Sequence, residues 1–147
     1  MNGKMYIFGG HHRTGSGQQA FHSLYECQLK LESQRDDLFK WKKIQVESPQ
    51  TRDSHSCVTF MDQILIFGGS SKKSTFNDLF KYNVNQRMWT KLEAIFDEGE
   101  QPSPREGHVG VLIEGDKMLV HGGYDERYSC FSDAFVLVGL HKEIDQA

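Results

Sequence analysis

Short apolar runs that end in a pair of glycines recur three times along the chain. They occupy residues 4–10, 63–69 and 117–123, with the sequences Lys-Met-Tyr-Ile-Phe-Gly-Gly, Gln-Ile-Leu-Ile-Phe-Gly-Gly and Lys-Met-Leu-Val-His-Gly-Gly. A short continuous run of apolar, β-branched residues predicts a strand that is buried on both faces. The following glycines predict a backbone turn that side chains would obstruct. The three copies therefore indicate a repeat architecture.

Further features fall into register with the glycine pairs. Arg-Asp-Ser-His at residues 52–55 and Arg-Glu-Gly-His at residues 105–108 each precede an apolar run, a polar turn and the glycine-ended strand. A third strand alternates apolar and polar residues and places Tyr25, Phe80 and Phe135 at equivalent positions. A fourth strand carries Trp41 in the first unit and Trp89 in the second. Each unit thus predicts four short antiparallel strands, and radial stacking of such sheets is the β-propeller arrangement.

These features together resemble the kelch repeat, whose unit is roughly 50 residues long. They are the Arg-x-x-His opening, the Phe-Gly-Gly strand end, Asn-Asp-Leu-Phe-Lys-Tyr at residues 77–82 and a spaced tryptophan. The middle unit, residues 52–92, carries the whole pattern, and the resemblance covers nearly the whole chain. It implies an all-β fold of kelch-type β-propeller blades, each of four antiparallel strands, with about three blades present in an incomplete ring.

The unit boundaries follow from the same alignment. We expect blade one at residues 1–47 without its first strand, blade two at residues 51–93, and blade three at residues 104–140 without its fourth strand. Kelch propellers usually close with about six blades, so we expect part of a larger propeller, a truncated isoform, or a half that needs a partner. An open array exposes apolar faces and strand edges, which favours self-association that would complete the propeller, or marginal stability.

Composition narrows the class of partner. The chain has 147 residues, 37% of them hydrophobic, and a net charge of −3. Nothing in this balance favours nucleic acid or an anionic membrane. No run approaches the roughly 18 apolar residues that span a bilayer, and no signal peptide is apparent. The three cysteines are widely spaced and odd in number, so we expect a reducing compartment, the cytoplasm or the nucleus.

The variable loops are the expected binding surface. Antiparallel strands place the loop after each glycine pair on one face, together with the connectors between blades, and specificity sits in loops while the scaffold repeats. In kelch proteins that bind peptides this face commonly forms the pocket, which the resemblance extends to this chain. Candidate partner-binding residues are His11, His12, Arg13, Lys72, Lys73, Tyr124, Arg127 and Tyr128. Four of these residues carry positive charge that suits an acidic peptide or a C-terminal carboxylate: Arg13, Lys72, Lys73 and Arg127. The alternative interpretation is that they are solvated loop charges.

Other repeated residues are interpreted as scaffold. Arg52 and Arg105 are expected to bond to neighbouring backbone, His55 and His108 to be structural histidines, and Trp41 and Trp89 to pack between blades. The glycines complete this structural motif at positions Gly9, Gly10, Gly68, Gly69, Gly122 and Gly123. A longer insertion at residues 30–40 is expected on the opposite face. It is interpreted either as a second contact site or as a solvated loop insertion.

A catalytic constellation is not signalled. No nucleophile-elbow pattern is present. We interpret Ser54 and His55, beside Asp53, as the residues that begin the first strand of the second unit. A metal site from His11, His12 and His121 is disfavoured, because adjacent residues of a strand point to opposite faces. We therefore expect no metal and no cofactor, and a non-catalytic protein–protein interaction module, such as a scaffold or part of a ubiquitin-ligase substrate receptor. The alternative is a fragment of a propeller enzyme similar to galactose oxidase.

Overall fold

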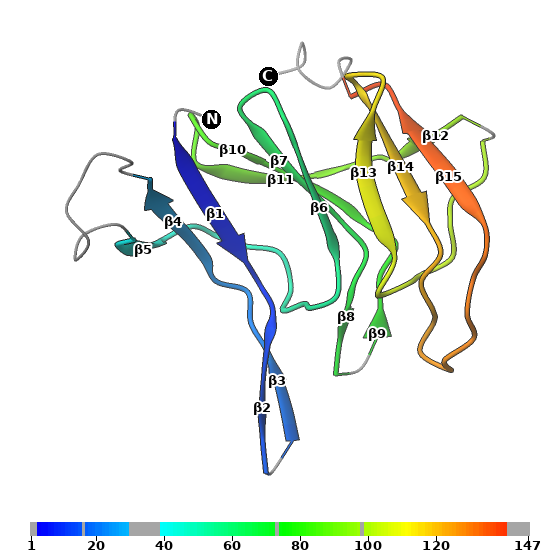
Figure 1. The fold of residues 1–147 in the computed structure, drawn as a ribbon, viewed down its shortest axis with the longest axis horizontal. Helices are drawn as coiled ribbons and strands as arrows, with labels where there is room; N and C mark the ends of the chain where they lie inside the picture. The colour runs from blue at the N-terminus through cyan, green and yellow to red at the C-terminus, as the bar shows by residue number, and fades with distance from the viewer. Residues whose placement is uncertain (1–2, 16, 30–38, 73, 98, 141–147) are drawn as a thin grey trace.

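The regular secondary structure of the described residues consists of antiparallel sheets, as the repeat predicts. The computed structural model describes residues 3–15, 17–29, 39–72, 74–97 and 99–140 (Figure 1). Within these ranges three larger sheets stand side by side and do not close into a ring. No described segment forms a helix long and apolar enough to cross a membrane. The prediction of an all-β fold of propeller-type blades is confirmed.

Each larger sheet corresponds to one repeat unit. Blade one contains β1 (Lys4–Phe8), β4 (Leu24–Gln28) and β5 (Trp41–Ile44), in the order β1-β4-β5. Blade two contains β6 (Ser56–Phe60), β7 (Gln63–Phe67), β10 (Leu79–Asn83) and β11 (Met88–Leu92), in chain order across the sheet. Blade three is built on β13 (Val109–Ile113), β14 (Lys117–His121) and β15 (Ala134–Val138). The insertion predicted at residues 30–40 falls largely outside the described residues.

Blade three differs from the expectation that it lacks a fourth strand. A two-residue strand, β12 (Ile95–Phe96), pairs antiparallel with Val138 and Leu137 of β15. It comes from the connector between blades two and three, which the sequence had assigned only as a loop. Phe96 is 5% exposed and its ring lies edge-on to Phe67 at 6.1 Å and Phe135 at 6.0 Å. Burial of this ring explains why the connector runs along the edge of β15, since a free strand edge is unfavourable.

The glycine-ended strand of blade two carries the core between the blades. Successive side chains of a strand point to opposite faces, and all five residues of β7 are buried. Ile64 and Ile66 belong to the cluster shared with blade one, whereas Leu65 and Phe67 belong to the cluster shared with blade three. Each buried aliphatic or aromatic side chain of this kind contributes about 1.5–3 kcal/mol. The unbroken apolar run at residues 64–67 therefore reflects a strand sandwiched between two neighbouring sheets.

The outer faces of blades one and three are less buried than the two faces of β7. Met5 and Ile7, the counterparts of Ile64 and Ile66, are 38% and 49% exposed on blade one, and Val109 is 56% exposed on blade three. Trp89 packs between blades, with its ring 4.8 Å from that of Phe8, whereas Trp41 is 38% exposed. Self-association over these faces stays a prediction, which sedimentation at several concentrations tests.

Candidate functional site

Loops of all three blades meet around one pocket. The hairpin of β2 (His11–Thr14) and β3 (Gly17–Ala20) extends from blade one, and the shorter hairpin of β8 (Ser70–Ser71) and β9 (Ser74–Thr75) extends from blade two. Both leave the same side of the molecule as the loop between β14 and β15 (Figure 1). Together they enclose a cavity of about 580 Å³. We call it the three-blade pocket; its lining residues are His11, Arg13, Gly17, Gln18, Ala20, Asp53, Ser54, Ser70, Ser71, Lys72, Glu106, Tyr124 and Tyr128.

The structure brings together only some of the candidate binding residues. His11, Arg13, Lys72, Tyr124 and Tyr128 line the three-blade pocket. His12 does not, because it alternates with His11 and Arg13 along β2 and so lies on the other face of the hairpin. Arg127 instead lines a separate cavity of about 470 Å³ together with Ser103, Pro104 and Phe131. Lys73 lies outside the described residues.

Two acidic residues that were not among the predicted binding residues line the pocket. Asp53 and Glu106 occupy the same repeat position, directly after the repeated arginines. Asp53 is 4% exposed and accepts hydrogen bonds from Gln18 Nε2 at 3.1 Å and from Ser54 Oγ at 2.9 Å. The signal was available, because an acid stands between arginine and histidine in both copies. The pocket is therefore not uniformly positive, unlike the surface expected from Arg13 and Lys72 alone.

The repeat explains how these acids are held. The residue that follows the second glycine is His11 in blade one, Ser70 in blade two and Tyr124 in blade three. Asp53 exchanges two backbone hydrogen bonds with Ser70, and Glu106 does so with Tyr124. Side chains then link adjacent blades: Ser70 Oγ donates to Glu106 Oε2 at 2.6 Å, and His11 Nδ1 lies 3.6 Å from Asp53 Oδ1. The pocket wall is thus continuous from one blade to the next.

An aromatic pair forms the blade-three side of the pocket. The rings of Tyr124 and Tyr128 stack with centroids 6.0 Å apart and planes inclined by 18°. Tyr128 is 81% exposed. The carboxylate of Glu106 is the main cause that raises the pKa of Tyr124, and burial adds to it. The Tyr124 phenol is therefore a neutral hydrogen-bonding group near neutral pH, and the two rings present surface that a partner can cover.

The loop that carries this pair is pre-organised by its own backbone. Asp125 Oδ1 accepts hydrogen bonds from the backbone N–H groups of Arg127 and Ser129, both at 2.9 Å. The Ser129 backbone N–H is the largest cause that lowers the pKa of Asp125. Such an Asx-type turn fixes a loop without a tight core beneath it. Less conformational entropy is then lost when a ligand binds.

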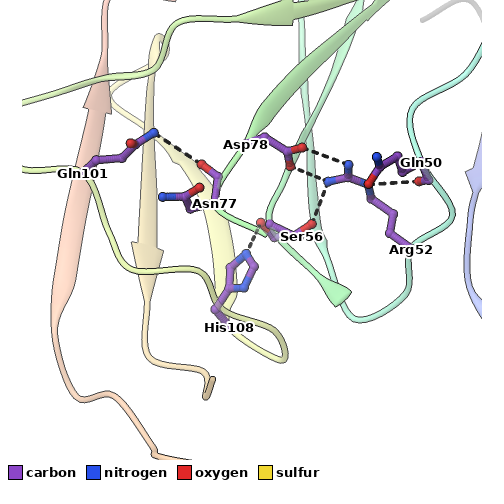
Figure 2. Close-up of polar contacts among 8 residues, drawn as sticks. Gln50, Arg52, Ser56, Asn77, Asp78, Gln101 and His108 are labelled. Atoms are coloured by element: carbon purple, nitrogen blue, oxygen red, sulfur yellow. Dashed lines mark hydrogen bonds and ion pairs between the residues drawn. The ribbon is translucent and has the colours of Figure 1, made fainter. Parts of the chain in front are cut away.

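The repeated arginines are placed as scaffold, within their own blades rather than against neighbouring backbone. Arg52 is fully buried, donates to the backbone carbonyl of Gly68 at 2.9 Å, and forms a bidentate pair with Asp78 at 2.6 and 3.1 Å (Figure 2). Arg105 repeats this arrangement with Gly122 at 3.0 Å and with Asp133 at 2.5 and 3.0 Å. The Arg105 guanidinium is the main cause that lowers the pKa of Asp133. Neither arginine lines the three-blade pocket.

Close backbone approach between blades explains the glycine pairs. The N–H of Gly69 donates to the carbonyl of Arg105 at 2.9 Å, as that of Gly10 does to Arg52 at 3.0 Å. Gly69 has φ +88, and a Cβ there would lie 2.6 Å from the carbonyl oxygen of Asp53. Only glycine fits both the positive φ and this approach. The turn thereby sets where the pocket loops leave the scaffold.

One serine–histidine contact resembles the nucleophile–base pair of a hydrolase. Ser56 Oγ and His108 Nε2 share a hydrogen bond of 2.8 Å between blades two and three (Figure 2). Both residues are 7% exposed, and His108 Nδ1 has no hydrogen-bond partner. A nucleophile–base pair needs substrate access and a group that orients the base. This contact joins blades two and three. Separately, within the described ranges no group of three or more His, Cys, Asp or Glu residues is placed to hold a metal ion.

Comparisons with known proteins agree with the blade geometry. The family model described as the KLHDC2/KLHL20/DRC7 Kelch-repeats domain matches residues 1–141. The flagellar outer-arm dynein alpha chain of Chlamydomonas reinhardtii is 31% identical over 91% of this chain and 3% of its own length. Kelch domain-containing protein 1 of Homo sapiens is 29% identical over 84% and 34%, respectively, and an F-box/kelch-repeat protein of Arabidopsis thaliana is 26% identical over 93% and 28%.

The chain spans no more than about a third of the length of these relatives. Among solved structures, that of YjhT superposes with a TM-score of 0.62 over 84% of this chain and 42% of that chain, at 18% identity, which shows likeness of fold alone. The family match, the repeated sequence motif and the stacked antiparallel sheets agree. The chain belongs to the Kelch-repeat family.

Proposed function

We propose that this chain is a non-catalytic protein-interaction module that binds a peptide segment of a partner protein in the three-blade pocket. The observation that carries the proposal is the convergence of loops from three blades on one cavity. Kelch-repeat proteins generally bind other proteins. Because scaffold and loops are separate parts of each repeat, the loops are free to differ while the blades stay the same.

The chemistry of the pocket favours a polypeptide over a small apolar ligand. A volume of about 580 Å³ lies within the range of ligand sites. The lining combines Asp53 and Glu106 with Arg13 and Lys72, so opposite charges are available within one cavity. Exposed tyrosines are preferred anchors at protein interfaces, because a rigid ring buries much area at low entropic cost. Tyr128 therefore supplies the anchor, and the charged groups select side chains of the partner.

The cellular setting is a proposal of the same kind. Recognition of this type suits a scaffold, or the substrate-receptor part of a ubiquitin ligase, in the cytoplasm or the nucleus. The F-box/kelch-repeat relative supports the second role through its name alone. Co-purification of the full-length protein with ligase subunits tests this role, and their absence from the purified complex would contradict it.

A displayed library of random peptides provides the probe for the pocket itself. Peptides selected on the 147-residue chain are measured by fluorescence anisotropy against variants that leave the scaffold unchanged. Tyr128→Ala removes the exposed anchor and Lys72→Glu reverses a rim charge. We expect each to weaken binding by roughly tenfold or more, as loss of an interface anchor does.

The matched control is Lys42→Glu, which reverses an exposed lysine of β5 that does not line the pocket. It should leave the affinity within about twofold. Equal affinities for the chain and for both pocket variants would refute the proposal. Loss of affinity in the Lys42→Glu variant alone would place the binding surface on blade one instead.

A further inference from the structure

The three-blade pocket contains two carboxylates that lack a partner of fixed positive charge. Asp53 is 4% exposed, and its carboxylate accepts hydrogen bonds from Gln18 and Ser54. Glu106 accepts one from Ser70 through Oε2. Among the residues that the structure describes, no lysine or arginine lies within ion-pair distance of either carboxylate. Because a buried charge is unfavourable without a counter-charge, this part of the pocket suits a cation that a ligand brings.

The pocket's own cations belong to the hairpins of blades one and two. Arg13 lies on β2, and Lys72 lies in the turn between β8 and β9. His11 Nδ1 lies 3.6 Å from Asp53 Oδ1, and this contact is an ion pair only when the imidazole is protonated. Among the described lining residues, blade three supplies an acid and two tyrosines and no cation. The charges of the pocket are therefore divided between its two sides.

Aromatic surface lies beside these acidic groups. The charge of Glu106 is the main cause that raises the pKa of Tyr124, and the charge of Asp53 adds to it. Both carboxylates are therefore near enough to act on the Tyr124 side chain. The ring of Tyr128 stacks on that of Tyr124, and the face of an aromatic ring attracts a cation through its quadrupole. Carboxylates and ring faces thus favour positive charge at the same side of the pocket.

The backbone holds the Tyr128 ring in this place against its own preference. Tyr128 has φ +60, a left-handed conformation that strains a residue with a large side chain. Its N–H donates to the carbonyl of Asp125 at 3.0 Å, which keeps the loop in this conformation. The side chain is 81% exposed, so burial in the folded chain does little to offset the strain. Strain of this kind points to a functional role for the ring.

We propose that the three-blade pocket selects partner segments that carry an arginine or lysine side chain, an inference that rests on the peptide-binding function proposed above. The basic side chain lies against the ring of Tyr128 and donates to Oε1 of Glu106, while Ser70 keeps its hydrogen bond to Oε2. A charge-assisted hydrogen bond and a cation–π contact then act on one group. A neutral residue at this position leaves the carboxylates without a counter-charge, so the pocket discriminates against it.

Two displayed peptide libraries test this selectivity. One contains all the natural amino acids, and the other omits arginine, lysine and histidine. A pocket binder is a peptide whose affinity falls about tenfold or more with Tyr128→Ala. We expect pocket binders from the complete library alone, each with a basic residue. Pocket binders of equal affinity from both libraries would overturn the inference and leave the proposed function standing. An absence of pocket binders from both would refute the proposed function, and the inference with it.

A double-mutant cycle locates the basic group. In a selected arginine peptide, citrulline replaces the arginine and removes its charge. In the chain, Glu106→Gln removes the carboxylate charge and keeps an oxygen that accepts from Ser70. We expect each change alone to weaken binding by about tenfold in fluorescence anisotropy, and both together to cost little more than one. The control is Glu114→Gln, which neutralises an exposed acid in the turn between β13 and β14 and should leave the affinity within about twofold.

The ring contact has its own pair of variants. Tyr128→Phe keeps the ring and should bind the arginine peptide as the parent does, whereas Tyr128→Leu should weaken it more than it weakens the citrulline peptide. Additive losses in the cycle would overturn the proposal, as would a Glu114→Gln variant that loses as much affinity as Glu106→Gln. Equal affinity of the parent chain for the arginine and citrulline peptides would overturn it without any variant of the chain.

Discussion

Individual buried side chains decide how each blade is held together. Arg52 and Arg105 are fully buried, yet each is matched by a carboxylate, a backbone carbonyl and two aromatic faces. Removing one member of a buried pair leaves the other charge without compensation, whereas an exposed pair contributes little. The equivalent partners in both copies show that each guanidinium is held inside its own blade.

Arg52→Met should lower the free energy of unfolding by about 3 kcal/mol, because Asp78 then loses its partner. The matched control is Arg87→Met, which removes an exposed arginine 3.4 Å from Glu26 and should cost less than about 1 kcal/mol. Urea denaturation measures both. Equal losses would show that Arg52 contributes no more than a surface charge.

The two interblade histidines make stability depend on pH. Burial, followed by the guanidinium of Arg52, lowers the pKa of His55 to about 4, and burial with Arg105 lowers that of His108 to about 4. In the unfolded chain an imidazole protonates near 6.5. Between these values the unfolded state binds more protons, so stability rises with pH in this window.

The free energy of unfolding should therefore be constant above pH 6.5 and fall as the pH is lowered from 6.5 to about 4. His108→Gln should be less stable than the parent at pH 7 but show a shallower decline. Urea titrations at several pH values measure this slope. An unchanged slope in His108→Gln would mean that other groups cause the pH dependence.

At the scale of elements, the short strand β12 completes blade three from outside its own repeat. Phe96→Ala should destabilise the chain by about 3–4 kcal/mol, because it opens a cavity beside Phe67 and Phe135. Its neighbour provides the control: Ile95 is 55% exposed, and Ile95→Ala should cost well under 1 kcal/mol. Similar losses in a urea titration would imply that β12 does not pack as the structure shows.

The strands of the repeat could be predicted from the sequence. The strand β12 and the place of Asp53 and Glu106 in the pocket could not. Strand β7 is recognisable in the sequence because both of its faces are buried and four of its five residues, 64–67, are apolar. Residues 95–96 are too short for a period to show, and Phe96 is fixed only by partners distant in sequence. Asp53 and Glu106 stood in a repeated motif, yet their place in the pocket depends on backbone pairing with Ser70 and Tyr124.

At the scale of the whole molecule, the glycine pairs set the stacking of blades. Gly10 and Gly69 both have positive φ, but a Cβ at Gly10 meets nothing within 4 Å, whereas one at Gly69 meets backbone of Asp53 and His55. Gly10→Ala should cost about 1 kcal/mol through backbone strain alone. Gly69→Ala should cost several times more, because the connector that opens blade two must move as well.

Thermal and urea unfolding of the two variants compare these costs. A loss of about 1 kcal/mol in both variants would show that backbone conformation, and not close approach, requires the glycines. A larger loss in Gly69→Ala supports the view that the stacked scaffold fixes the positions of the loops above it, and with them the shape of the three-blade pocket.

Hydrogen exchange of the chain with and without a library-selected peptide tests the binding surface most directly. The three-blade pocket predicts slower exchange in segments of all three blades, namely residues 11–20, 70–75 and 124–130, with little change in β5 and β11. Protection confined to a single blade, or to the strands that lie away from these loops, would contradict the claim that three loops act as one binding site.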